Sequence, residues 1–121
     1  MNFQKKVTKT NYIREYLTVL NGLIDLTPRE MDVLVEMVKI DIAWIPRTPL
    51  EVKNIISTDN RRLILKETRM GKSNFTKILN KLISIKLLVL STDNKYIIND
   101  LLKPKIDSKG KIEIRFVLDV V

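Results

Sequence analysis

The sequence has 121 residues, a formal net charge of +8, and neither histidine nor cysteine. These absences exclude disulfides, thiol catalysis, histidine acid–base chemistry and the usual zinc sites. No apolar run is long enough to span a bilayer, and Lys5 and Lys6 are not followed by the apolar stretch of a signal peptide. We expect one cytoplasmic domain that is not an enzyme and needs no cofactor or metal. Its basic charge indicates an acidic partner, nucleic acid rather than a membrane.

Two helices are predicted in the first third of the chain. Apolar residues at helical spacing predict a helix over 11–24 with a wide apolar face. Thr27 at the N-cap, Pro28 at the first helical position and Glu30 three residues after the cap are typical of a capping box. A second helix should therefore begin there and run to about Ile40. Its inward residues are expected to be Met31, Leu34, Val35, Met37 and Val38.

The next segment contains two helix-breaking residues, Pro46 and Pro49. Proline removes a backbone donor and restricts the residue before it, so we expect an extended segment over 41–48. Residues 42–45 are apolar enough to form a short strand within it. Since proline is tolerated in the first turn of a helix, residues 49–56 are predicted to form a short helix.

Two further helices are predicted around Gly71. Ser57 to Asn60 is rich in capping residues and predicts a helix over 59–69. Gly71 breaks that helix, and the apolar spacing after it predicts another over 73–85. The pair is joined by a turn too short for any other element, so the two helices should be neighbours in space.

The last third of the chain has the patterns of strands. Two short apolar segments, 87–90 and 96–98, flank the polar turn 91–95 and predict a hairpin. A loop over 103–111 follows. Residues 112–118 alternate in polarity, which predicts a strand with one buried face. Its apolar residues are Ile112, Ile114, Phe116 and Leu118.

Positive charge is concentrated on residues 61–86. This stretch holds eight basic residues and one acidic residue, Glu67, so its net charge of +7 is nearly all of the chain's +8. Basic charge gathered on one element is typical of a protein that binds phosphates. The alternative is that these are ordinary solvated side chains. The eight residues are Arg61, Arg62, Lys66, Arg69, Lys72, Lys77, Lys81 and Lys86.

The same stretch carries a family resemblance. From Met70 the chain reads Met-Gly-Lys-Ser-Asn-Phe-Thr-Lys, followed by Leu79 and Leu82 at core positions and by Leu87-Leu88 entering the hairpin. This order resembles the winged-helix DNA-binding domains of bacterial and phage regulators, such as the multiple-antibiotic-resistance-regulator group. The resemblance implies a mainly α fold with a small antiparallel β wing (α+β), a winged helix-turn-helix. It also implies sequence-specific binding of double-stranded DNA and a role in transcription regulation, through recognition helix 73–85.

Three features point elsewhere. Lys86 stands where these families often carry glycine, which argues against a left-handed cap at that position. Ile78, Ile83 and Ile85 make the helix more apolar than usual, so it could bind a protein in a nucleoprotein or virion assembly instead. The sequence Tyr96-Ile97-Ile98-Asn99 resembles a wing strand of plasmid and phage replication initiators. Replication initiation or replisome organisation is therefore an alternative role.

A recognition helix in the major groove would reach base edges with its outward side chains. Asparagine pairs with adenine, lysine with guanine, and serine or threonine with either. We expect phosphate contacts from Arg69, Lys72 and Lys81, and a phosphate or minor-groove contact from Lys95 at the wing tip. The core should receive Phe75, Ile78, Leu79 and Leu82. The outward residues are Ser73, Asn74, Thr76, Lys77, Asn80 and Lys81.

The expected organisation has three parts. Residues 1–26 form an N-terminal arm and helix, with a weak strand or disordered arm at 3–8; residues 27–99 form the winged domain; residues 100–121 form a loop and strand. The first helix and the last strand each have an apolar face that the minimal domain need not cover, so we expect a homodimer through them. A dimer would place two recognition helices about one DNA turn apart. The expected location is the cytoplasm of a bacterial or phage-infected cell.

Overall fold

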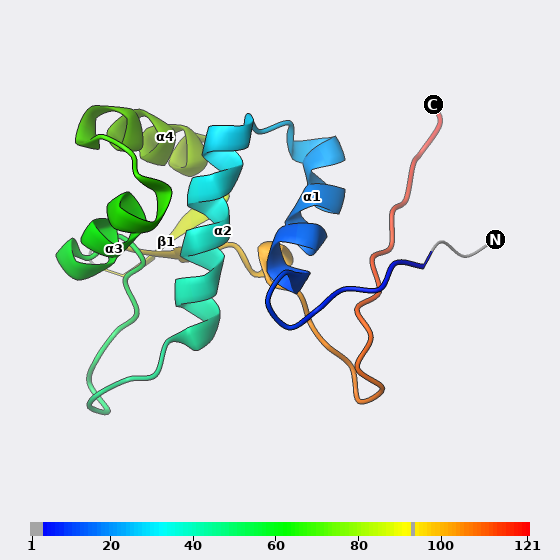
Figure 1. The fold of residues 1–121 in the computed structure, drawn as a ribbon, viewed down its shortest axis with the longest axis horizontal. Coiled ribbons are helices and arrows are strands. Elements are labelled where there is room, and N and C mark those ends of the chain that lie inside the picture. The colour runs from blue at the N-terminus through cyan, green and yellow to red at the C-terminus, as the bar shows by residue number, and fades with distance from the viewer. Residues whose placement is uncertain (1–3, 93) are drawn as a thin grey trace.

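The computed structural model describes residues 4–92 and 94–121. Phe3 of the expected arm and Asp93 of the expected turn lie outside these residues, and residues 4–8 form no strand. Within the described residues, four α-helices precede an antiparallel hairpin and a short 3₁₀ helix (Figure 1), which confirms a mainly α fold with a small β wing. The elements are α1 (Tyr12–Ile24), α2 (Pro28–Ala43), α3 (Thr58–Thr68), α4 (Lys72–Ser84), β1 (Leu88–Thr92), β2 (Lys95–Ile98) and η1 (Asp100–Leu102).

Helix α2 is the centre of the fold. It packs against α1, α3, α4 and β2, and Figure 1 shows it between α1 on one side and α3 and α4 on the other. The predicted capping box is confirmed: the Thr27 side chain accepts from the Glu30 N–H (3.3 Å), and the Glu30 carboxylate accepts from the Thr27 N–H (2.9 Å). All five predicted inward residues of α2 are buried. The helix therefore starts where local chemistry fixes it and is held by core contacts on several sides.

Two predictions between α2 and α3 are wrong. Helix α2 continues to Ala43, so the expected strand at 42–45 does not form and the extended segment begins only after the helix. Pro46 restricts only the residue before it, and nothing earlier stops the helix. The expected helix at 49–56 is also absent, and near its end one backbone N–H bonds to β2 instead of to a carbonyl of its own segment. The Ile55 N–H donates to the Tyr96 carbonyl (2.8 Å).

The hairpin forms as predicted, but the turn before it differs. Lys86 has a φ of 64°, so the expectation against a left-handed cap was wrong. The Lys86 N–H donates to the Ile83 carbonyl (3.1 Å) and the Leu87 N–H to the Leu82 carbonyl (2.9 Å), which is the Schellman arrangement. The Asn99 side-chain amide also donates to the Lys86 carbonyl (3.0 Å). These hydrogen bonds offset the strain that a glycine would have avoided.

A buried carboxylate joins α2 to the wing. The Asp41 side chain is fully buried and accepts from the ammonium groups of Lys53 (2.8 Å) and Lys103 (3.1 Å). Its other oxygen accepts from the Ile98 N–H (3.1 Å). Burial by itself would raise the pKa of Asp41, but these hydrogen bonds outweigh it and hold the pKa below its ordinary value. The charge is therefore compensated from three separate parts of the chain.

The strand predicted at residues 112–118 does not form. The loop after η1 is present, but residues 112–118 make no strand and run unpaired beside α1 (Figure 1). Alternation of polarity selects the face that a strand would bury, but it supplies no partner strand. Ile112 and Ile114 are half-buried, whereas Phe116 and Leu118 are exposed. The apolar face is thus only partly covered within one molecule.

Candidate nucleic-acid interface

Helices α3 and α4 are joined by a turn of three residues. Arg69 closes α3 in the left-handed conformation (φ 53°), and its N–H donates to the Leu65 carbonyl. Met70 is buried and Gly71 is the N-cap of α4, with no side chain capping the helix. The first backbone N–H groups of α4 are consequently available to an external acceptor, and the dipole of the helix favours an anion there.

The two faces of α4 are as predicted. Phe75, Ile78, Leu79 and Leu82 are buried and face the core formed with α2 and β1. The hydroxyl of Thr76 donates to the Lys72 carbonyl (3.0 Å), so it keeps only acceptor capacity for a ligand. The remaining polar residues project into solvent from the face opposite the core. The exposed residues are Ser73, Asn74, Thr76, Lys77 and Asn80.

Lys81 differs from the other expected DNA contacts. Its ammonium group lies 2.8 Å from the Glu30 carboxylate, which already accepts from the Thr27 N–H. Burial by itself would raise the pKa of Glu30, but the hydrogen bonds from Lys81 and Thr27 outweigh it and lower the pKa. The pair links α4 to the first turn of α2, so the charge of Lys81 is largely neutralised within the molecule.

The other basic residues of this region are not neutralised. In the described part of the chain, seven of the eight basic residues between 61 and 86 make no ion pair, the exception being Lys81. Elsewhere, acidic side chains pair with the cations around α1, α2 and η1, as in Arg14–Asp32 and Lys39–Glu36. Uncompensated positive charge therefore gathers on α3, α4 and the turns that follow them.

A groove lies between the N-terminal ends of α3 and α4. It has a volume of about 720 Å³, with Arg61, Arg62 and Lys72 on its walls and Phe75 among its apolar lining residues. The Arg61 guanidinium is anchored by donating to the Ile56 carbonyl (2.7 Å). Our sequence prediction did not include Arg61 or Arg62 among the binding residues. Their place in the first turns of α3 was readable from the sequence, but their approach to Lys72 depends on how the two helices pack.

The remaining predicted residues are more dispersed. Arg69 is exposed on the turn before α4, so it lies on the same helix pair as Lys72. Lys95 begins β2, across from Thr92, and does not line the groove. The three isoleucines differ in solvent exposure: Ile78 is buried, Ile83 is half-buried against the core and Ile85 is 42% exposed. These side chains form no continuous exposed apolar surface on α4.

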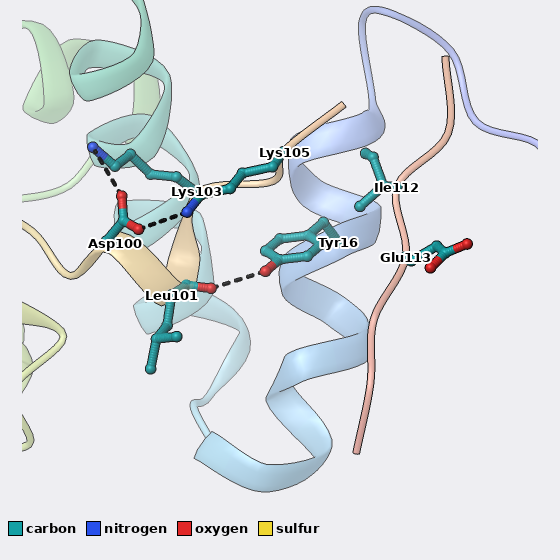
Figure 2. A pocket seen from close by; sticks show the side chains of 7 residues that line it. All are labelled: Tyr16, Asp100, Leu101, Lys103, Lys105, Ile112 and Glu113. Carbon is teal, nitrogen blue, oxygen red and sulfur yellow. Dashed lines mark hydrogen bonds and ion pairs between the residues drawn. The ribbon is translucent and has the colours of Figure 1, made fainter. Parts of the chain in front are cut away.

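A smaller hollow of about 180 Å³ lies between α1 and the segment after η1 (Figure 2). Its two cations are already paired, since Lys103 and Lys105 lie 3.8 and 2.8 Å from the Asp100 carboxylate. The Tyr16 hydroxyl, whose pKa is raised by burial, donates to the Leu101 carbonyl (2.8 Å). These internal pairs leave little positive charge for an anion, so the groove at α3 and α4 is the stronger candidate.

Comparisons with models of protein families, with curated proteins and with solved structures gave no match. Within residues 4–92 and 94–121, no helix is both long and apolar enough to cross a membrane. The same residues contain no group of three or more acidic, histidine or cysteine side chains placed to hold a metal ion. The candidate site is therefore defined by its own geometry and charge.

Proposed function

We propose that this protein is a winged helix-turn-helix protein that binds double-stranded DNA, with α4 as the recognition helix. The observation that carries the proposal is the distribution of ion pairs: apart from Lys81, the cations of α3 and α4 make no ion pair in the described part of the chain, whereas many cations elsewhere are paired. An element order of helices followed by an antiparallel hairpin is compatible with this fold. We infer a regulatory role in transcription from the resemblance of residues 70–77 to bacterial and phage regulators.

The exposed face of α4 has suitable chemistry for this role. Asn74, Lys77 and Asn80 offer donors and acceptors to base edges in the major groove. Lys72 and the uncapped N–H groups at the start of α4 suit a phosphate oxygen. Arg61 and Arg62 extend the positive surface onto α3, where they add sequence-independent contacts to the backbone.

The protein-binding alternative loses its main support. It required an exposed apolar patch at Ile78, Ile83 and Ile85, yet only Ile85 is exposed. The replication alternative rested on Tyr96 to Asn99. In the fold two of these residues have structural roles: Ile98 is buried in the core, and Asn99 caps η1 by accepting a hydrogen bond from the Leu101 N–H (3.1 Å). A replication role stays open, but DNA contact through α4 is common to both roles.

The test is binding of a fluorescent random-sequence duplex, measured by anisotropy across a salt series. The Arg69→Ala/Lys72→Ala variant removes two expected phosphate contacts, so it should bind less tightly and flatten the dependence of log K on log salt by about two units, roughly 0.9 for each contact. The matched control is Lys5→Ala/Lys39→Ala, which removes the same charge from lysines that pair with Glu15 and Glu36. Equal flattening by both variants, or no binding at low salt, would contradict the proposal.

A further inference from the structure

Residues 112–118 combine a strand pattern with an unsatisfied backbone. Among the described residues, the backbone N–H groups of 112–121 donate no hydrogen bond, and the last contact before them is the Lys111 carbonyl, which accepts from the Asp107 N–H (2.9 Å). Unpaired N–H and C=O groups along an extended segment are a template for another strand. The segment lies beside α1 and away from the hairpin (Figure 1), so neither β1 nor β2 pairs with it.

The side chains of this segment already point in two directions. Figure 2 shows Ile112 between the segment and α1, and Glu113 on the opposite side, away from the helix. Ile112 and Ile114 are half-buried, whereas Glu113 and Arg115 are exposed. The even-numbered face is therefore turned towards α1. The face that carries Glu113 and Arg115 is turned to solvent. The backbone N–H and C=O groups lie along the two edges of the segment.

The charges of the segment suit pairing with itself. In an antiparallel pair centred on Ile114, Glu113 lies opposite Arg115 of the second copy, and the two-fold axis repeats this pair. The same register sets Ile112 opposite Phe116 of the second copy, twice, and Ile114 opposite its own equivalent. Aromatic–aliphatic and opposite-charge pairs are both favourable across strands. Among residues 112–116 every side chain faces an apolar partner or its electrostatic complement, whereas Val117 faces Lys111 and Leu118 faces Gly110.

The neighbouring registers that keep apolar residues on one face are less favourable. Centring the pair on Glu113 sets two glutamates face to face and puts Lys111 opposite Arg115. Centring it on Arg115 sets two arginines face to face. Like charges directly opposite each other are destabilising. A shift by one residue would place charged side chains on the apolar face. Of the registers centred on Glu113, Ile114 and Arg115, the one centred on Ile114 is therefore the one that pairs opposite charges without pairing like charges.

We propose that residues 112–118 form an antiparallel two-stranded ladder with the same segment of a second copy of this chain, centred on Ile114. The ladder satisfies the open backbone groups and covers Phe116, which is 48% exposed in the single chain. The partner is a second copy rather than an unrelated strand, because the charge order Glu113, Arg115 is complementary to itself in this orientation. This inference does not depend on DNA binding, and its tests contain no DNA.

The first test uses cysteine cross-linking, for which the natural chain provides a clean background because it has no cysteine. Ile114→Cys should form a disulfide-linked dimer on mild oxidation, because the two residues at the centre lie directly opposite. Ile112→Cys is the matched control: it lies opposite Phe116, so its own equivalent is displaced by four residues, roughly 13 Å along the strand. Equal linkage at both positions, or more at 112, would overturn the proposal.

The second test measures self-association by sedimentation equilibrium. Arg115→Glu places Glu113 opposite a glutamate and should raise the dissociation constant of the dimer about tenfold. The double exchange Glu113→Arg/Arg115→Glu restores both opposite-charge pairs and should restore the affinity. Both residues are exposed, so neither change disturbs the core. A natural chain that sediments as a monomer at every concentration, or a double exchange that fails to restore association, would overturn the proposal.

Discussion

Lys81 and Glu30 form an ion pair at 2.8 Å across 51 positions of sequence, and it joins α4 to the first turn of α2. We expect Lys81→Ala to lower the free energy of unfolding by about 0.5 to 1 kcal/mol, because the pair is partly exposed. Its effect on DNA affinity should be smaller than that of Lys77→Ala, whose charge is uncompensated. Urea denaturation and anisotropy of the two variants check this, and a larger loss of affinity from Lys81→Ala would contradict it.

Gly71 allows the cap of α4 to be changed without steric cost. Its φ and ψ of −76° and 153° suit any residue, and an added Cβ would meet nothing within 4 Å. Gly71→Ser and Gly71→Asp should each raise the free energy of unfolding by a few tenths of a kcal/mol (roughly), because both side chains can cap the helix. Only Gly71→Asp should weaken DNA binding, since it adds negative charge beside Lys72. Similar binding by the two variants at low salt would argue against an anion at this helix end.

The environment of Asp41 predicts a pH-dependent contribution to stability. Because the folded-state pKa lies below the ordinary value, the ionised carboxylate contributes stability that is fully present above the unfolded-state pKa, roughly 3.9. That contribution is lost as the pH falls through the folded-state pKa. Asp41→Asn should cost about 2 to 3 kcal/mol at neutral pH, since the amide keeps one acceptor oxygen but removes the negative charge that compensates Lys53 and Lys103.

The measurement is denaturation of both proteins from pH 7 to pH 2. The stability gap between the natural chain and Asp41→Asn should narrow as acid protonates Asp41. Asp32→Asn is the control, because Asp32 pairs with Arg14 and Arg29 at the surface. This substitution should lower the free energy of unfolding by less than about 1 kcal/mol. A gap that stays constant with pH would show that the effect is one of packing and not of charge.

The left-handed backbone of Lys86 offers a route to a more stable variant. The left-handed conformation destabilises a non-glycine residue by roughly 1 kcal/mol, so Lys86→Gly should raise the free energy of unfolding by up to about 1 kcal/mol. Lys86→Ala removes the same charge while retaining a Cβ, and it should leave stability nearly unchanged. Thermal or urea denaturation of the two variants separates backbone strain from charge. Equal stabilities would mean that the Schellman hydrogen bonds already absorb the strain.

The sequence was most informative where the interactions that decide structure are local. Thr27, Pro28 and Glu30 lie within four positions of one another, and their capping box formed as predicted. The two faces of α4 followed from apolar spacing alone, since the helical period fixes which residues share a side. For the same reason the four longer predicted helices and the hairpin formed in the expected order, whereas the short helix expected at 49–56 did not form.

The features that escaped prediction depend on distant partners. Residues 49–56 have an acceptable helical start but form no helix, and the Ile55 N–H donates to Tyr96, 41 positions away in the sequence. The conformation of Lys86 depends partly on the Asn99 side chain, thirteen positions away. Arg61 and Arg62 of α3 line the same groove as Lys72 of α4 only because of how the two helices are placed in the fold. A local sequence pattern does not reveal such long-range contacts. For the same reason the alternating pattern of residues 112–118 predicted a strand but could not show that it has no partner strand in the fold.

The outer edge of β2 is already occupied. The Tyr96 N–H donates to the Asn54 side chain (3.2 Å), the Tyr96 carbonyl accepts from Ile55 and the Ile98 N–H donates to Asp41. An edge filled in this way cannot recruit a foreign strand, so this side of the wing is protected from β-sheet aggregation. The strand addition that we propose takes place instead at residues 112–118, on the far side of α1 from α4 in Figure 1. Two molecules joined there would each keep the basic face of α4 uncovered.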